Sequence, residues 1–302
     1  MLMTGVVVAC GVLGISLFFL LWLVPVRRKV MRRFRFSTPL LWWMQGLSLL
    51  VAVFALVTAI WFPGDSLMEA VAVGLTVLFL TVGLGALDRL RLLTQTAVNR
   101  RVYMMIAAHP GDLVYGAGGT IASLWDCGHN IHGLTVTNGR SGEDVDLLPR
   151  RTREWARFLG CNSMTLGNIP VEQAEQDYAM IRELIEDQIQ RYNPDVIITH
   201  SPHDSDPVRQ AVAQAVVRMA NPRQAVLGLR SESSTADFQP GQVYNIVDYL
   251  DMKNTVMDQH HQEWDRTETR EVYEVLRRGS GVPLPGCPVD ETTSCGVTGQ
   301  PG

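Results

Sequence analysis

Cysteines are few in this sequence and follow no recognisable pattern. The 302 residues include five cysteines, an odd number, and none of them forms a CxxC pair. We therefore expect neither a disulfide framework nor a thiolate zinc site, and reduced cysteines suit a cytoplasmic compartment. A surplus of positive charge is lacking too: the net charge is −4, which gives no indication of a nucleic-acid partner. No internal repeat is visible.

Charge is missing from long stretches near the N-terminus. Residues 1–26, 36–64 and 70–87 contain no charged side chain. About 20 apolar residues in a helix are enough to cross a bilayer, so we predict three transmembrane helices. They lie near Thr4–Val26, Leu40–Phe62 and Ala70–Leu87, and the third is short and contains glycine. A signal peptide or a buried hairpin explains these lengths less well.

The basic residues between the first two spans predict the orientation. They are Arg27, Arg28, Lys29, Arg32, Arg33 and Arg35. Short loops rich in arginine and lysine stay in the cytoplasm. We therefore expect an integral membrane protein, in contact with the lipid bilayer of the plasma membrane, with its N-terminus outside and its C-terminal domain cytoplasmic.

Residues after the third span alternate between strand-like and helix-like segments. We predict a membrane region over residues 1–88, a linker over 89–101, an α/β domain over 102–278 and a disordered tail over 279–302. The alternation predicts a Rossmann-like, mostly parallel sheet flanked by helices. We expect strands at 102–107, 132–137, 163–166, 195–199, 225–229 and within 238–248, and helices at 150–159, 172–192, 208–220 and from about 249 to 278.

The first candidate site follows the strand predicted at Val102–Ala107. His109 and Asp112 come directly after it, and a glycine-rich turn over Gly116–Gly119 leads into a helix. Ligands of open α/β sheets bind at the carboxyl ends of strands, where a histidine and an aspartate could hold a metal. The alternative, left open here, is that His109 is only a turn residue.

The second candidate site is Thr199–Val212, which also begins at the carboxyl end of a predicted strand. It contains four residues able to bind a metal or transfer a proton: His200, His203, Asp204 and Asp206. Such residues also cap helices and bind loop backbone, and this plainer explanation stays open for each of them.

The first segment resembles the opening motif of the PIG-L (LmbE-like) family of zinc-dependent sugar N-deacetylases. The matching residues are Ala108, His109, Pro110, Asp112, Gly118, Gly119 and Thr120. The resemblance implies that an aspartate at 111 would be the general base and that Asp112 binds zinc. Because residue 111 is glycine, the base is missing while the ligand remains.

The second segment resembles the family's second motif, but with changes. The resemblance places the family's zinc-binding histidine at Arg209 and a histidine that steadies the oxyanion at Asp206. A guanidinium stays protonated and cannot ligate a cation. We therefore take His203 as the third metal ligand beside His109 and Asp112, and Asp204 and Asp206 as the catalytic carboxylates of a rebuilt site.

Two weaker resemblances suggest substrate contacts. Arg151 begins a segment similar to the family's Arg-x-x-Glu helix, and His260 lies in a segment similar to its late histidine region. The resemblance implies that both residues lie near the substrate. A solvated helix face is the alternative for Arg151.

Three functions follow as hypotheses. In the first, the chain is a membrane-tethered hydrolase, a zinc-dependent deacetylase acting on an N-acetylglucosamine-type sugar or glycolipid. In the second, it is a catalytically inactive member, a pseudoenzyme that binds such a ligand or a partner. In the third, the membrane helices carry the function and the α/β domain is a scaffold.

Overall fold

The structure, a computed structural model, describes residues 2–31, 34, 37–90, 100–139, 147–258 and 267–279. The chain divides into two compact units, residues 1–93 and 94–302. Most of the predicted linker and all but the first residue of the predicted tail lie outside the described residues.

Helices make up the first unit: α1 (Leu2–Trp22), α2 (Val24–Met31), α3 (Ser37–Trp61) and α4 (Ser66–Leu90). Three stretches, Met3–Trp22, Ser37–Trp61 and Ser66–Leu90, are long and apolar enough to cross a membrane. The third is longer than the sequence pattern predicted, because α4 includes charged residues at both ends.

Small residues bring two of these helices together. A Cβ added to Gly14 of α1 would lie 2.9 Å from the Cβ of Ala52 in α3, so glycine permits the close approach. Large apolar side chains point outward instead, with Trp43 and Trp61 each 76% exposed. An apolar outer surface of this kind suits contact with lipid.

The second unit contains a seven-stranded sheet in the order β3-β2-β1-β4-β5-β7-β6. Its strands are β1 (Val102–Ala107), β2 (Asn130–Thr137), β3 (Ser163–Ile169), β4 (Val196–His200), β5 (Ala225–Leu229), β6 (Gln242–Asn245) and β7 (Arg270–Arg277). The first five strands are parallel, and β7 runs antiparallel to both β5 and β6. The predicted fold, a mostly parallel Rossmann-like sheet, is confirmed.

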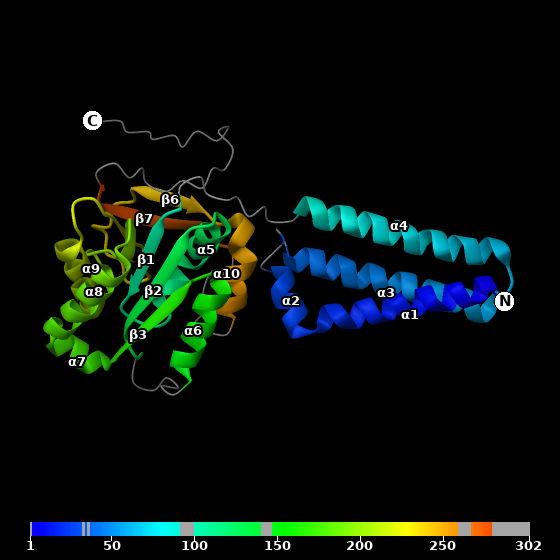
Figure 1. Ribbon diagram of the computed structural model, residues 1–302, viewed down its shortest axis with the longest axis horizontal. Coiled ribbons are helices and arrows are strands. Elements are labelled where there is room, and N and C mark those ends of the chain that lie inside the picture. Colours follow the sequence, from blue (N-terminus) through cyan, green and yellow to red (C-terminus); the bar gives the residue numbers. More distant parts are fainter. Residues whose placement is uncertain are drawn as a thin grey trace. The chain divides into compact units, whose positions relative to one another are not determined.

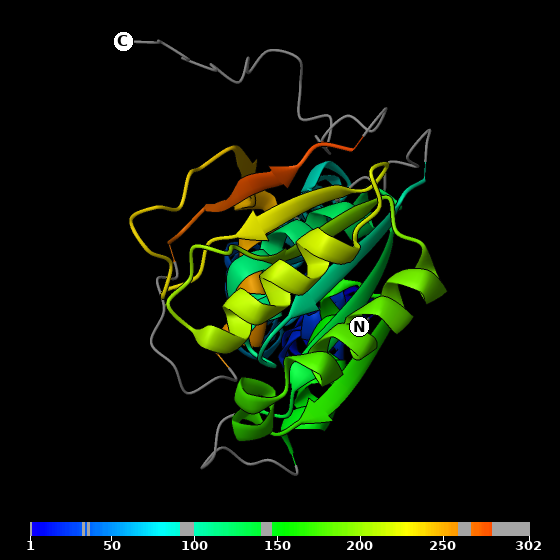
Figure 2. The same ribbon diagram turned by 90° about the vertical axis from the view of Figure 1, so that its left-hand side faces the viewer.

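Helices cover both faces of this sheet (Figure 1). On one face lie α7 (Val171–Gln176), α8 (Tyr178–Tyr192) and α9 (Pro207–Met219), which stand in front of the strands in Figure 2. The other face carries α5 (Asp112–Asp126), α6 (Leu148–Leu159) and α10 (Leu250–Met257), the last preceded by the 3-10 turn Val247–Tyr249. The first turns of α5 and α9 follow the ends of β1 and β4.

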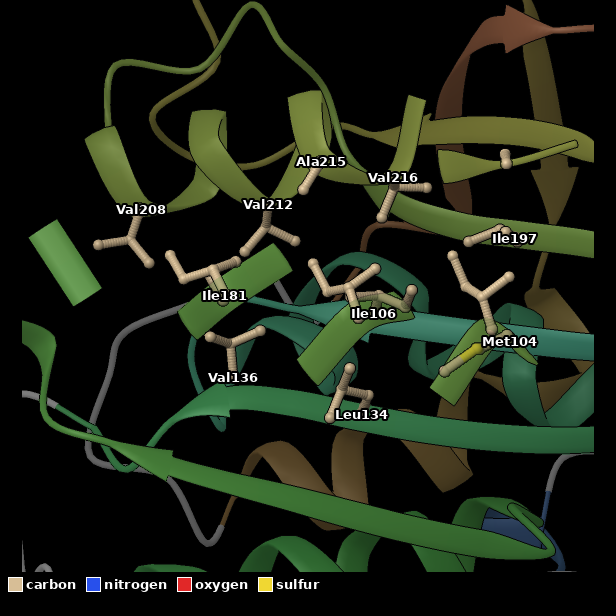
Figure 3. Packing of buried hydrophobic residues seen from close by; sticks show 14 of the residues in the cluster. Met104, Ile106, Leu134, Val136, Ile181, Ile197, Val208, Val212, Ala215 and Val216 are labelled. Atoms are coloured by element: carbon tan, nitrogen blue, oxygen red, sulfur yellow. The ribbon is translucent and has the colours of Figure 1, made fainter. Parts of the chain in front are cut away.

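Apolar side chains from β1, β2 and β4 pack against α8 and α9 (Figure 3). Ile106 and Ile197 of the sheet and Ile181 and Val212 of the helices are almost completely buried. This cluster fixes the sheet beneath the loops that carry the candidate residues.

Three predicted elements were wrong in detail. The glycine-rich turn is instead part of α5, which begins at Asp112. The helix predicted at 172–192 is broken into α7 and α8 by Asp177, whose side chain accepts the Ala179 N–H. The last predicted helix ends at Met257, and the strand β7 follows it.

The cysteines also differ from expectation. Cys127 is disulfide-bonded, whereas Cys10 and Cys161 are free thiols. The prediction that the cysteines are reduced is therefore wrong for Cys127.

Candidate functional site

The two motifs meet where the order of the strands reverses. From β1 the chain continues to β2 on one side, and it later returns to place β4 on the other side of β1. Ligands of open α/β sheets bind at such a switch point. His109 follows β1 and His200 ends β4, and a hydrogen bond of 2.9 Å joins the Ala108 N–H to Nε2 of His200.

Asp112 and Arg209 form an ion pair at this point. Nη2 of Arg209 donates to Oδ1 of Asp112 at 2.7 Å, and Nε approaches Oδ2 at 3.4 Å. Oδ2 also accepts the His109 N–H at 2.9 Å and lies 3.2 Å from Nε2 of His200. Both carboxylate oxygens of Asp112 are thus engaged by the protein itself.

Burial and charge set the ionisation of this pair. Burial alone would raise the pKa of Asp112, but the neighbouring His200, Arg209 and His109 hold it well below its usual range. Burial would lower the pKa of Arg209, but Asp112 beside it shifts the pKa upward overall. Both groups are 7% exposed and stay charged as partners.

His109 is held in one orientation by Thr137. Its Nδ1 lies 2.9 Å from Oγ1 of Thr137, and that hydroxyl donates to the Ala108 carbonyl at 2.9 Å. Because the hydroxyl proton is used, Nδ1 must be the donor in this contact, which leaves Nε2 facing Asp206. Nε2 lies 3.4 Å from Oδ2 of Asp206.

Asp206 is the N-cap of α9 as well as the neighbour of His109. Its Oδ1 accepts the N–H groups of Val208 and Arg209, each at 3.0 Å. Burial would raise its pKa, but the hydrogen bond with His109 and the backbone bond lower it well below the usual range. The capping function, weighed as an alternative in the sequence, is therefore present.

Asp204 is completely buried and holds loops together. Its oxygens accept hydrogen bonds from the hydroxyls of Ser231 and Ser233, and from the Asp206 N–H at 2.9 Å. With these partners Asp204 connects the loop after β4 to the loop after β5.

The remaining predicted residues are not gathered at the pair. Nδ1 of His203 lies 3.2 Å from Oε2 of Glu274, and within the described ranges no three His, Cys, Asp or Glu side chains are grouped to hold a metal ion. Arg151 lies in the first turn of α6 and is partly exposed. His260 lies outside the described residues.

A cavity of about 590 Å³ lies beside Arg209. Carboxylates dominate its polar lining, which comprises Glu172, Glu175, Ser205, Asp206, Arg209, Glu232 and Ser233. Its size suits a small organic ligand such as a sugar.

A family model described as GlcNAc-PI de-N-acetylase, PIG-L, matches residues 104–220. The chain carries a PIG-L family domain. It is 27% identical over 177 residues to the uncharacterized deacetylase YaiS of Escherichia coli, over 56% of this chain and 95% of that protein. The probable N-acetyl-alpha-D-glucosaminyl L-malate deacetylase 2 of Bacillus cereus is 25% identical over 184 residues, covering 54% of this chain and 84% of the relative.

Among solved structures, the N,N'-diacetylchitobiose deacetylase from Pyrococcus horikoshii is similar, with a TM-score of 0.49 and 16% identity. The superposition covers 59% of this chain and 84% of that one. By its family model and its relatives in sequence, the PIG-L domain described here is related to deacetylases.

The zinc ion that the family resemblance implies does not fit the residues of this PIG-L domain as they are arranged. A metal at Asp112 needs an oxygen with a free lone pair facing it, and Arg209 is bonded there. Among the described residues, His109 has the orientation typical of a metal ligand, because its Nδ1 is bonded to Thr137. A guanidinium therefore occupies the position to which the metal would bind.

Neither Ser233 nor Thr137 belongs to the PIG-L motifs, so neither was predicted as a site residue from the sequence. Ser233 comes from the loop after β5, which matches no family motif, and it accepts a hydrogen bond from Nη1 of Arg209. The run of serines after an apolar strand was the available signal. Thr137 ends β2, and its role depends on the parallel pairing of β2 with β1.

Proposed function

We propose that this chain is a membrane-anchored PIG-L protein that binds an amino sugar, free or lipid-linked, without hydrolysing it by zinc chemistry. The observation that carries the proposal is the start of α5. Gly111 offers no carboxylate as a base, and the adjacent Asp112 is bonded to Arg209. Zinc-assisted hydrolysis needs a base and an accessible ligand set together.

Binding is supported by the position of the cavity and by the relatives. The cavity includes Arg209 and Asp206, which belong to the site itself. The family description and the Bacillus cereus relative name N-acetylglucosamine-type compounds. The three apolar helices support an anchor that keeps the domain close to a lipid-linked ligand.

The test is equilibrium binding by the full chain in detergent, combined with an assay for acetate release. Using an N-acetylglucosamine-type panel and the corresponding amines, we expect saturable binding and no release above buffer. Glu175→Gln, which alters the cavity lining, should weaken binding. Turnover by the unmodified protein would contradict the proposal, as would failure to bind any member of the panel.

A second candidate is a deacetylase with a rebuilt site. Nε2 of His109 lies 3.4 Å from Oδ2 of Asp206, which favours this candidate because ligands of one tetrahedral zinc lie at a similar separation. Asp206→Asn separates the two candidates, since asparagine still caps α9 but lacks the charge. Acetate release that is lost in this variant, while the Tm is kept, would favour the rebuilt enzyme.

A further inference from the structure

Arg209 is fixed from two sides of the site. On one side its Nε and Nη2 face the two oxygens of Asp112, the side-on arrangement in which arginine binds carboxylates. On the other side its Nη1 donates to the hydroxyl of Ser233. An arginine that had only replaced a metal-binding histidine, with no role of its own, would not be expected to bind partners on two separate elements.

The Ser233 contact continues into the buried carboxylate of Asp204. Ser233 donates to Oδ1 of Asp204 at 2.6 Å, and Ser231 donates to Oδ2. Asp204 in turn accepts the backbone N–H of Asp206, next to the first turn of α9. Arg209 therefore connects the start of α5 with the loops that follow β4 and β5.

A bound metal ion connects loops in the same way, by placing a positive charge among ligands from separate elements. The difference is that a guanidinium cannot lose its charge or dissociate. Asp112 is buried, so it needs a cation in contact, and removing that cation leaves a buried charge without compensation. Arg209 supplies the cation as part of the chain.

We propose that Arg209 replaces the metal ion of this PIG-L domain as a permanent cation, so that the domain folds and keeps its site in order without metal. The inference concerns the same site as the proposed function and adds that the domain has no metal requirement.

The experiment measures metal content and thermal unfolding of the full chain in detergent. After dialysis against EDTA and then against ZnCl2, metal is determined by inductively coupled plasma mass spectrometry. We expect the unmodified protein to retain well under one zinc per chain and to change its Tm by less than about 1 °C between EDTA and zinc, since a ligand stabilises only when it binds the folded state.

Arg209→His should behave in the opposite way. Without metal its Tm should fall, and zinc should raise it by roughly 4 °C or more while about one ion binds per chain. Arg209→Lys keeps the positive charge but loses the planar guanidinium that binds both oxygens of Asp112. In EDTA its Tm should lie between those of the unmodified protein and Arg209→His, and it should bind no zinc. Arg218→His is the matched control, because Arg218 is exposed on the same helix, and it should resemble the unmodified protein.

Stoichiometric zinc in the unmodified protein, with a Tm that falls in EDTA, would overturn the inference. So would an Arg209→His variant that is as stable in EDTA as the parent. These outcomes differ from failure of the proposed function: a zinc-loaded chain without acetate release refutes only the inference, and a metal-free chain that releases acetate refutes only the proposed function.

Discussion

Gly111 and Asp112 are neighbours at the start of α5 and differ in what surrounds them. Gly111 precedes the helix and makes no side-chain cap, whereas Asp112 is buried against Arg209. A base positioned beside a substrate typically accelerates hydrolysis by about 10²–10⁴-fold. The missing base at Gly111 and the ion pair of Asp112 with Arg209 therefore both impair the hydrolysis step.

The sequence predicted part of this arrangement. The position of Arg209 in the second motif was enough to exclude it as a metal ligand. Its contact with Asp112 could not be predicted, because the direction of a long side chain depends on the packing of α9 beside β4. Ser233, 24 residues further along the chain, is brought to Arg209 only by the fold.

Cys161 provides a prediction about pH at the scale of one residue. Burial raises the pKa of its thiol to about 12, above the value of about 8.5 typical of an unfolded chain. A raised folded pKa means that the stabilisation is complete below pH 8.5 and is lost as the pH rises toward 12. The loss should reach roughly 5 kcal/mol at the upper end, because each pKa unit corresponds to about 1.4 kcal/mol.

The measurement is the free energy of unfolding between pH 7.5 and 11 for the parent and for Cys161→Ala. Buried tyrosines titrate in the same direction, so only the difference between the two proteins reports on Cys161. We expect the curve of the parent to fall more steeply above pH 9. Parallel curves would show that the thiol is not protected.

Helix α5 carries a run of glycines that ordinary propensity disfavours. Each glycine costs a helix about 1 kcal/mol relative to alanine, so Gly→Ala is normally stabilising. A Cβ at position 119 would lie 2.6 Å from the Cβ of Ile246, whereas at position 118 the nearest atom is Cγ of Lys253 at 3.3 Å. The structure therefore predicts different results for two adjacent positions.

We expect Gly119→Ala to destabilise the chain by about 1–3 kcal/mol through overpacking, and Gly118→Ala to change stability by less than about 1 kcal/mol. Thermal unfolding of the two variants side by side tests this, and each serves as the control for the other. Equal effects at both positions would contradict the close approach of α5 to Ile246.

Two whole elements, the helix α5 and the strand β7, differ from what the local sequence pattern predicted. Glycines at 116–119 were interpreted as a turn because local propensity was considered without the tight packing against Leu229 and Ile246. The segment Arg270–Arg277 is rich in charged residues that favour helices, yet it forms the strand β7. Its buried Glu271 pairs with Lys253 at 2.8 Å and also accepts the Gly119 and Thr120 N–H groups.

Strands at the centre of the sheet were predicted well. Val102–Ala107 and Ala225–Leu229 have the predicted bounds. Each is a short apolar run flanked by polar or turn residues, so the local pattern and the tertiary environment agree. Elements at the edge of the sheet lack this agreement.

For the whole molecule, the distribution of charge predicts an orientation. With six basic residues between α1 and α3, we expect the C-terminal unit in the cytoplasm. A reporter that works only in the cytoplasm should be active when it is fused after Gly302, and one that works only outside should be inactive. Exchanging the six basic residues for glutamine should give a mixture of chains with the C-terminus inside and outside. A reporter active outside the cytoplasm would contradict the prediction and would suit the disulfide bond of Cys127.

We infer that Gly111 and Arg209 together remove zinc-dependent hydrolysis from an otherwise retained PIG-L domain. The most direct measurement compares acetate release by the unmodified chain, Gly111→Asp, Arg209→His and the double variant, each supplied with zinc, on a panel of N-acetylglucosamine derivatives. We expect release from the double variant alone, because base and metal act as a unit and each single change restores only half of it. Strong release by the unmodified chain, abolished by His203→Ala, would contradict the account, as would a double variant that binds zinc and ligand and still releases no acetate.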